Sequence, residues 1–187
     1  MTRIVAGAWG GRVLQVPRSG TRPTSERVRE AIFSRLDSQG VIAGARVLDI
    51  FAGSGALGLE ALSRGATDAM LVDSARGAVQ VLRVNVAALS AGERVQVVGA
   101  DAVRFAASLG ANERFDLVFI DPPYTLDSGI LDQVLSSVAT HLAPAGIIIL
   151  ESSSRAVLPD LPPQLMNRTT KTYGDTQVSF LEVAPKN

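Results

Sequence analysis

The sequence predicts an α/β fold: a Rossmann-like, mostly parallel sheet with helices on both faces and a terminal antiparallel hairpin. From residue 46 onward, five short apolar runs of β type alternate with segments of helical spacing, a pattern typical of parallel sheets covered on both faces. A glycine-rich turn follows the first run and opens a helix, as in nucleotide-binding folds. Near the end, two β-type runs flank a Gly-Asp turn, which predicts a hairpin that closes the sheet.

The expected elements follow from apolar runs, helical periodicity and turn residues. Gly65 is expected to end the first helix, and Val79, Leu82, Val86 and Leu89 share one face of the second. The predicted parallel strands span 46–51, 69–73, 95–99, 115–120 and 146–151; the helices span 55–65, 75–92 and 126–142, with another starting at 102; a loop spans 152–164; and the hairpin pairs 168–173 with 176–183.

The N-terminal part predicts a folded extension that docks on the core. Residues 3–17 have the pattern of a hairpin, and a helix is expected from about Thr24 to Leu36, capped by Thr24 or Ser25. We therefore divide the chain into an N-terminal arm, defined here as residues 1–38, and a domain of residues 39–187.

Composition bounds the possible functions. Hydrophobic residues make up 47% and charged residues 19% of the 187-residue chain, as in an ordinary globular protein. With no Cys and a single His, His141, we expect no metal site, no disulfide and no cysteine nucleophile, and a structural role for His141. No apolar window suggests a signal peptide or a membrane span, so we expect a cytoplasmic protein.

Charge is unevenly distributed along the chain. Residues 1–46 contain eight Arg against three acids, whereas residues 47–187 contain ten Lys or Arg against fifteen acids. A basic arm on an acidic body is typical of a protein that meets nucleic acid from one side, although a solvated surface explains it equally well.

The stretch "VLDIFAGSGALGLE" predicts a cofactor site. It contains G-x-G-x-x-G at Gly53, Gly55 and Gly58, and Asp73 lies twenty positions beyond Gly53 at the end of the next strand. The glycines allow close backbone approach, and the acid can accept from both ribose hydroxyls, which suits NAD and S-adenosylmethionine (SAM) alike.

Asp49 favours SAM over NAD. A carboxylate just before the glycine turn disfavours a pyrophosphate but favours the ammonium group of a methionine moiety, directly or through water. Asp101 ends the third strand and is expected either to accept from the adenine amine or to cap the helix starting at Ala102. The predicted cofactor site comprises Asp49, Phe51, Gly53, Gly55, Asp73, Ser74, Asp101 and Ala102.

The stretch "FDLVFIDPPY" predicts a site for an amine acceptor. In a doubly wound sheet the first and fourth strands end side by side, so this segment should lie next to the glycine turn. The Asp121 carboxylate and the Pro122 carbonyl can accept from the two N–H groups of an exocyclic amine, while Pro122 and Pro123 restrict the backbone. Tyr124 can stack on a base that has left its helix. Taken alone, the same residues are also a common way to end a strand with a turn.

With both segments in view, the chain resembles class I, seven-stranded SAM-dependent amino-methyltransferases with an Asp-Pro-Pro-Tyr tetrad. More narrowly, it resembles the bacterial 16S ribosomal RNA guanine-966 N2-methyltransferase family. The resemblance spans nearly the whole chain and is carried by "RIVAGAWGGRVLQVP", "RPTSERVREAIFSRL", "DIFAGSGALGLEALSRGA", "FDLVFIDPPY" and "YGDTQVSF". It departs at Tyr124, where the family often has Phe.

This resemblance implies methyl transfer from SAM to the N2 amine of a guanine in 16S ribosomal RNA, within an assembling or assembled small subunit, by a monomer. The predicted RNA contacts are Arg3, Trp9, Arg12, Arg18, Arg22, Arg27 and Arg29. Pairing with Glu26, Glu30 or core carboxylates is expected to engage at least two of these arginines, and Thr24 and Arg27 are alternatively placed to contact the donor's carboxylate. The competing functions are an adenine N6-methyltransferase acting on DNA or RNA, an NAD-dependent oxidoreductase, and a noncatalytic RNA-binding factor.

Overall fold

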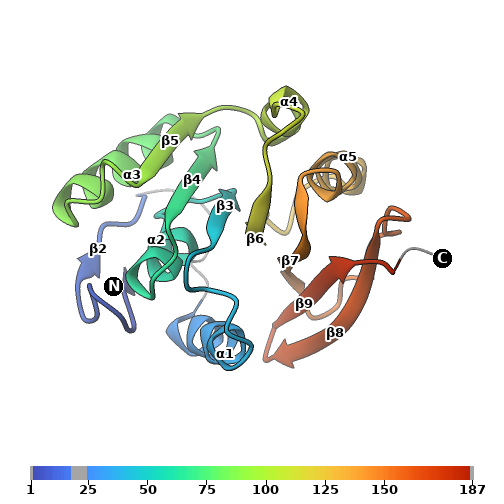
Figure 1. Cartoon of the computed structure of the whole chain (residues 1–187), viewed down its shortest axis with the longest axis horizontal. Coiled ribbons are helices and arrows are strands. Elements are labelled where there is room, and N and C mark those ends of the chain that lie inside the picture. Colours follow the sequence, from blue (N-terminus) through green and yellow to red (C-terminus); the bar gives the residue numbers. More distant parts are fainter. Residues whose placement is uncertain (1, 18–24, 186–187) are drawn as a thin grey trace.

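A seven-stranded sheet forms the centre of the molecule (Figure 1). The computed structural model describes residues 2–17 and 25–185, and the strands follow the order β5-β4-β3-β6-β7-β9-β8. Strands β3 to β7 pair in parallel, and β9 pairs antiparallel with both β7 and β8. The predicted fold is thereby confirmed. The strands are β3 (Arg46–Ile50), β4 (Asp68–Asp73), β5 (Val95–Gly99), β6 (Phe115–Ile120), β7 (Leu142–Ser153), β8 (Leu165–Tyr173) and β9 (Thr176–Val183).

Helices cover both faces of the sheet, as Figure 1 shows. Helices α1, α2 and α3 bury their apolar residues in one core cluster, and α4 and α5 bury theirs in a second cluster on the opposite face. This three-layer arrangement explains why the central strands are apolar on both sides. The helices are α1 (Glu26–Ser38), α2 (Ala56–Ser63), α3 (Arg76–Ala88), α4 (Ala102–Ser108) and α5 (Ser128–Ala139).

The strand order changes direction between β3 and β6. From β3, the chain adds β4 and β5 on one side and then returns to place β6 on the other side. Ile50 pairs with Ile120, so the last residues of β3 and β6 lie directly side by side. Ligands of doubly wound sheets bind at this point, beyond the carboxyl ends of the strands.

The N-terminal hairpin is present but shorter than predicted. Strands β1 (Thr2–Arg3) and β2 (Val13–Leu14) pair over two residues each. Beyond Arg3, the N–H groups of Val5 and Ala6 donate to the Glu60 carboxylate of α2, at 2.6 Å and 3.0 Å. The chain therefore leaves the hairpin ladder because a buried carboxylate on another element takes its donors.

The arm and the domain share one hydrophobic core. Ile4 and Leu14 of the hairpin, together with Ile32 and Leu36 of α1, belong to the same buried cluster as α2 and α3. Ser25 caps α1 by accepting from Val28 N–H at 3.2 Å, whereas Thr24, the alternative cap, lies outside the described residues.

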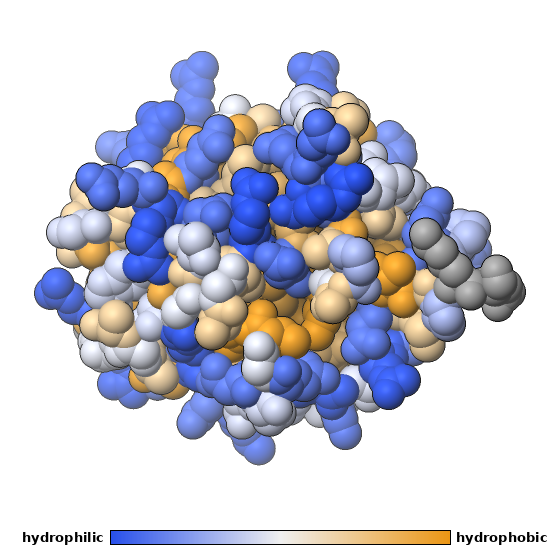
Figure 2. Space-filling view, viewed as in Figure 1, coloured by the Kyte–Doolittle hydropathy of each residue, from blue (hydrophilic) through white to orange (hydrophobic). Residues whose placement is uncertain are grey.

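The visible surface is largely polar. Figure 2 shows hydrophilic side chains over most of one face, with a smaller group of hydrophobic side chains in a hollow near its centre. Within residues 2–17 and 25–185, no helix has the length and apolar character needed to cross a membrane.

Candidate functional site

The bend after β3 has a backbone conformation that is unfavourable for most residue types. Gly53 and Gly55 have φ of 57° and 79°, and Phe51 adopts φ of 66° without being a glycine. Positive φ is costly for a side chain with a Cβ, and such strain is concentrated at functional sites. A Cβ on Gly55 would also lie 2.9 Å from Cδ2 of Leu82. The glycine bend, defined here as residues 51–55, thus depends on both glycines.

Asp73 holds this bend against the end of β4. Its Oδ2 accepts from Gly53 N–H and its Oδ1 accepts from Ala75 N–H, both at 2.9 Å. One carboxylate therefore fixes the glycine bend and the start of α3 relative to each other. Asp73 is half-buried, so part of its surface remains accessible at the end of β4.

Asp49 is a buried carboxyl group beneath the bend. It is 1% exposed, and its Oδ2 accepts from Gly58 N–H at 2.9 Å. The pKa of Asp49 is raised to about 8, mainly by burial and to a smaller extent by the nearby charges of Asp121 and Asp73, against the lowering effect of the Gly58 hydrogen bond. Asp73 ends β4 and Asp121 directly follows β6, the two strands that flank β3, so the three acids belong to neighbouring strands.

The Asp-Pro-Pro-Tyr tetrad follows β6 and lies next to the glycine bend. Asp121 comes directly after Ile120, the partner of Ile50. Asp121 and Pro123 are half-buried and Pro122 is buried. Tyr124 is 57% exposed, and its hydroxyl lies 3.0 Å from Oγ1 of Thr176 at the start of β9. The predicted proximity of the two segments is therefore present in the fold.

Asp101 caps α4. Its Oδ1 accepts from Val103 N–H and Arg104 N–H, both at 3.1 Å, which confirms the capping alternative. Asp101 is exposed and Ala102 is buried. This cap leaves the adenine contact of Asp101 as a prediction, since a capping carboxylate at a strand end can also face a ligand.

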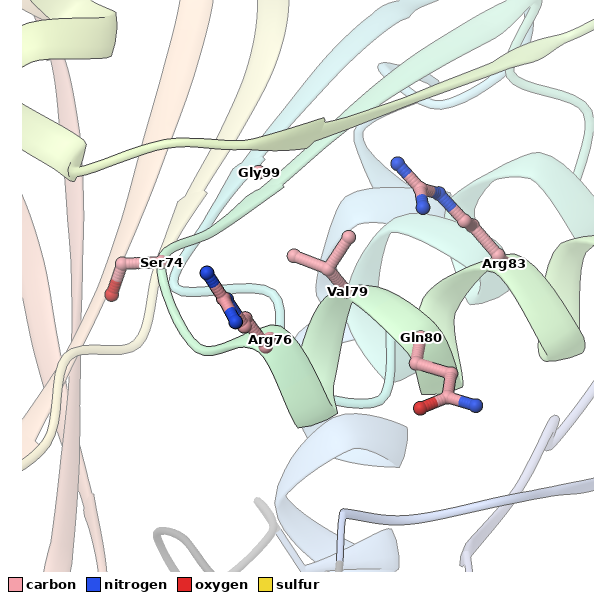
Figure 3. Close-up of a pocket in the computed structure, with 6 residues that line it drawn as sticks. All are labelled: Ser74, Arg76, Val79, Gln80, Arg83 and Gly99. Atoms are coloured by element: carbon pink, nitrogen blue, oxygen red, sulfur yellow. The ribbon is translucent and has the colours of Figure 1, made fainter.

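A hollow of about 590 Å³ opens between α3 and the ends of β4 and β5 (Figure 3). Ser74, a predicted cofactor residue, lies at one end of it with Gly99 and Arg76, and the hollow continues along α3. The two arginines in its wall were not predicted from the sequence. The lining residues are Ser74, Arg76, Val79, Gln80, Arg83 and Gly99.

The charges around the glycine bend suit a cationic ligand better than a phosphate. The charges of Asp121 and Asp73 act on Asp49 and raise its pKa, so their field favours positive charge at the bend. A Cβ added to Gly53 would meet no atom nearer than 3.9 Å, the Phe51 carbonyl oxygen. The bend therefore leaves open space for a ligand, and the SAM ammonium and sulfonium groups fit its electrostatics.

Several predicted RNA contacts are engaged within the protein. Arg3 forms an ion pair with Glu26 at 2.7 Å. Arg29 is 1% exposed. Its Nη1 lies 3.9 Å from Oε2 of Glu60, and its Nη2 donates to the Arg3 carbonyl oxygen at 2.9 Å. The prediction that Arg29 contacts RNA is wrong, because a guanidinium buried beside a core carboxylate is not accessible to RNA. Pairing of at least two arm arginines with acids is confirmed.

The other predicted RNA contacts differ in their surroundings. Arg12 and Arg27 are exposed and remain candidates, whereas Arg18 and Arg22 lie outside the described residues. Trp9 packs against the core cluster, and the guanidinium of Arg94 lies 5.6 Å from its ring centroid. The indole thus helps dock the arm, and its predicted stacking on a base has no support in this arrangement.

Two buried polar residues that connect the arm to the site were missed from the sequence. Besides its bonds to the arm, Glu60 accepts from Arg64 Nε at 2.7 Å. Asn85 of α3 accepts from Gln15 N–H at 2.9 Å and donates to the carbonyls of Gln15 and Ser54, at 3.0 Å and 2.9 Å. Each stands in an otherwise apolar stretch, "GLEAL" and "VNVAAL", and a lone polar residue in such a stretch is the signal for a buried partner.

Comparison with known proteins gives a consistent family relationship. The family model described as "Conserved hypothetical protein 95" matches residues 2–182. "Ribosomal RNA small subunit methyltransferase D" of Escherichia coli is 44% identical over 181 residues, which cover 95% of this chain and 87% of that protein. "Putative rRNA methyltransferase YlbH" of Bacillus subtilis is 35% identical over 182 residues, covering 95% of this chain and 97% of that protein.

Solved structures share the fold over the full length. The structure described as "Putative methyltransferase yhhF from Escherichia coli" superposes with a TM-score of 0.86 at 36% identity, and covers 99% of both chains. The match includes the N-terminal arm as well as the sheet, so the arm is a shared feature of both structures.

Proposed function

Because this chain belongs to the conserved hypothetical protein 95 family, we propose that it methylates the exocyclic N2 amine of one guanine, of the G966 type, in 16S ribosomal RNA. SAM is the proposed methyl donor. The relatives reported above carry the names of ribosomal RNA methyltransferases, and the Escherichia coli relative is named for the small subunit.

One observation supports this function most strongly. The parallel register of Ile50 with Ile120 brings the glycine bend and the Asp-Pro-Pro-Tyr tetrad side by side, beyond the carboxyl ends of two central strands. An amine-holding segment and a donor-binding segment must meet for methyl transfer, because effective catalysis requires the reacting atoms at near-contact distance. An oxidoreductase would need the bend but would leave the tetrad without a role.

The donor side is formed by the ends of β3, β4 and β5. We assign Asp73 to the ribose hydroxyls, Asp49 to the ammonium group directly or through water, and Asp101 with Ala102 to the adenine. Phe51, Gly53, Gly55 and Ser74 complete this side through their positions in the bend and next to Asp73. SAM, when bound, supplies an electrophilic methyl group on a sulfonium, and the surrounding carboxylates stabilise its positive charge.

The acceptor side is formed by the tetrad. The Asp121 carboxylate and the Pro122 carbonyl accept from the two N–H groups of the guanine amine, which turns its nitrogen lone pair away from conjugation with the ring. Pro123 restricts the backbone, and the exposed ring of Tyr124 stacks on the extruded base, a contact worth about 1–3 kcal/mol. The nitrogen forms the new bond to carbon as the carbon–sulfur bond breaks, and its surplus proton leaves to water or to Asp121.

The arm provides the surface for the RNA backbone in this proposal. Arg12 and Arg27 are exposed arginines of the arm that were predicted to contact phosphates, whereas Arg3, also exposed, is paired with Glu26. Arg18 and Arg22 are further candidates in the undescribed segment. We further propose that the protein acts as a monomer in the cytoplasm, on RNA within an assembling or assembled small subunit.

The experiment uses small subunits from a bacterial strain that lacks its own copy of this enzyme. Incubation with the protein and labelled SAM, followed by nuclease digestion and mass spectrometry, is expected to yield N2-methylguanosine at one nucleotide of 16S RNA. Calorimetry is expected to detect SAM binding and no NAD binding. Methylation of adenine instead of guanine, or binding of NAD, would contradict the proposed function.

A further inference from the structure

The Tyr124 side chain is tied to a distant element through its hydroxyl. Its Oη lies 3.0 Å from Oγ1 of Thr176, which is 52 residues further along the chain. Tyr124 is 57% exposed, so packing holds the ring on only part of its surface. A hydrogen bond at the far end of an exposed ring restricts both side-chain torsions and therefore fixes the direction in which the ring faces.

Thr176 is well placed to serve as an anchor because the sheet fixes its backbone on both sides. It is the first residue of β9, where it pairs with Ser153 of β7 and with Tyr173 of β8. A residue between two paired strands moves little compared with a loop residue. The anchor of the Tyr124 hydroxyl is therefore part of the rigid sheet.

The chain after β7 supports the turn that carries Thr176. Ser154 N–H donates to the Asp175 carbonyl at 2.9 Å, and Nε2 of Gln177 donates to the Ala156 carbonyl at 2.8 Å. These two bonds flank Thr176 in the sequence. They give a structural role to residues 154–156, in the loop predicted over 152–164, and to the late "YGDTQ" segment.

We propose that Thr176 is a positioning residue for methyl transfer: its hydroxyl holds the Tyr124 ring in the orientation that stacks on the target base. This inference rests on the proposed function, since it needs a base at the tetrad. Tyr124 needs its phenol for this role, because the ring reaches Thr176 only through its hydroxyl. A Phe ring would stack but would need another means of orientation.

The test compares Thr176→Val, which keeps the shape but removes the hydroxyl, with Thr176→Ser, which keeps the hydroxyl. Under single-turnover conditions on small subunits, Thr176→Val is expected to lower the methyl-transfer rate about threefold to tenfold, with SAM affinity unchanged. Thr176→Ser should restore most of the rate. Thr172→Val, an exposed position that pairs with Gln177 on the same hairpin, is the matched control and should leave the rate unchanged.

A double-mutant cycle links the effect to Tyr124. In the Tyr124→Phe background the anchor is already absent, so adding Thr176→Val should cause no further drop. Additive losses would overturn the positioning role, as would a Thr176→Val rate equal to that of the unmodified protein.

A second readout does not depend on activity and separates this inference from the proposed function. The chain has two tyrosines, Tyr124 and Tyr173, so the ring signals of Tyr124 can be assigned by NMR using Tyr124→Phe. Thr176→Val should shift these signals or speed ring flipping, and Thr172→Val should not. Unchanged signals would overturn the anchor even if the enzyme is active, whereas a shift in a protein that methylates no RNA would contradict only the function.

Discussion

Asp49 is fully buried, and two other acids, Asp73 and Asp121, act on it. A carboxyl group in this environment favours its neutral form, and its pKa is raised to about 8 by burial first and by Asp121 and Asp73 second. A bound cation has the opposite effect, because it favours the charged carboxylate. The same residue that weakens the free protein at high pH therefore strengthens binding of a cationic donor.

Replacing Asp49 with Asn is expected to flatten the pH dependence of stability. In the unfolded chain the Asp pKa is about 3.9, so between about pH 4 and pH 8 the folded state binds more protons, and the free energy of unfolding decreases as pH rises. The unfolding temperature should decrease from pH 5 to pH 8 by a larger amount in the unmodified protein than in Asp49→Asn. Equal decreases in both proteins would contradict the buried, protonated carboxyl.

Donor affinity provides the complementary check on Asp49. Calorimetry should show that SAM binds more tightly as pH rises toward 8 in the unmodified protein, with a proton released on binding, and that Asp49→Asn weakens binding and removes this trend. A SAM affinity independent of pH in both proteins would exclude Asp49 from the donor site.

Helix α2 starts directly from the glycine bend and packs closely against the sheet. Gly58 lies in its first turn with its N–H on Asp49, and a Cβ there would press on the Leu71 side chain and come within 3.2 Å of Asp49 Oδ2. The third glycine of G-x-G-x-x-G thus serves close packing between helix and strand.

Gly58→Ala is expected to lower the free energy of unfolding by about 1–3 kcal/mol through overpacking, and to weaken SAM binding by displacing the bend. Gly77→Ala is the control, because Gly77 lies in α3 and a Cβ there meets nothing within 4 Å, so the helix preference for Ala should make it neutral or stabilising. Urea unfolding measures the free energy of unfolding of both variants. If Gly58→Ala and Gly77→Ala change it equally, the helix does not pack closely against the strand at Gly58.

The elements themselves were largely predictable from the sequence. Local patterns located the five parallel strands, the terminal hairpin and the helix that Ser25 caps. The short pairing of β1 with β2 was not predictable, because it depends on Glu60, which is far away in sequence. Arg29 was misassigned for the same reason: helical spacing shows that a residue shares a face with Val28 and Ile32, but not that a carboxylate from α2 lies under that face.

The arm and the domain form one body through buried polar groups as well as apolar packing. Glu60 accepts from the backbone of Val5 and Ala6 and pairs with Arg64 and Arg29, while Asn85 joins Gln15 to the Ser54 carbonyl of the glycine bend. The surface proposed for RNA is thereby attached to the two helices that flank the donor site.

Glu60→Gln should destabilise the whole protein. The change leaves Arg29 and Arg64 without their shared charge partner, and breaking a buried ion pair in this way costs about 3–5 kcal/mol. Glu93→Gln, at an exposed position, is the control and should be nearly neutral. If both variants have the free energy of unfolding of the unmodified protein in urea, Glu60 does not stabilise the contact between arm and domain.

Charge reversal on the arm tests the RNA surface. Arg12→Glu should weaken binding to small-subunit RNA and reduce the slope of log affinity against log salt by about 0.7–0.9 for each phosphate that the arm no longer neutralises. Arg114→Glu, at an exposed position outside the arm in the loop before β6, is the control and should leave the slope unchanged. The same slope for Arg12→Glu as for the unmodified protein would remove Arg12 from the RNA-binding surface.

The juxtaposition of tetrad and glycine bend is tested most directly by measuring turnover and donor binding on one variant, Asp121→Ala. The variant loses an acceptor for the guanine amine but keeps the glycine bend, Asp49 and Asp73. The rate of methyl transfer to small subunits should fall at least about a hundredfold, as expected when a group that acts in the transition state is lost. The SAM affinity measured by calorimetry should stay within about threefold of the unmodified value, which is a change of less than about 1.4 kcal/mol in binding free energy. Turnover equal to that of the unmodified protein, with SAM still bound, would contradict the account.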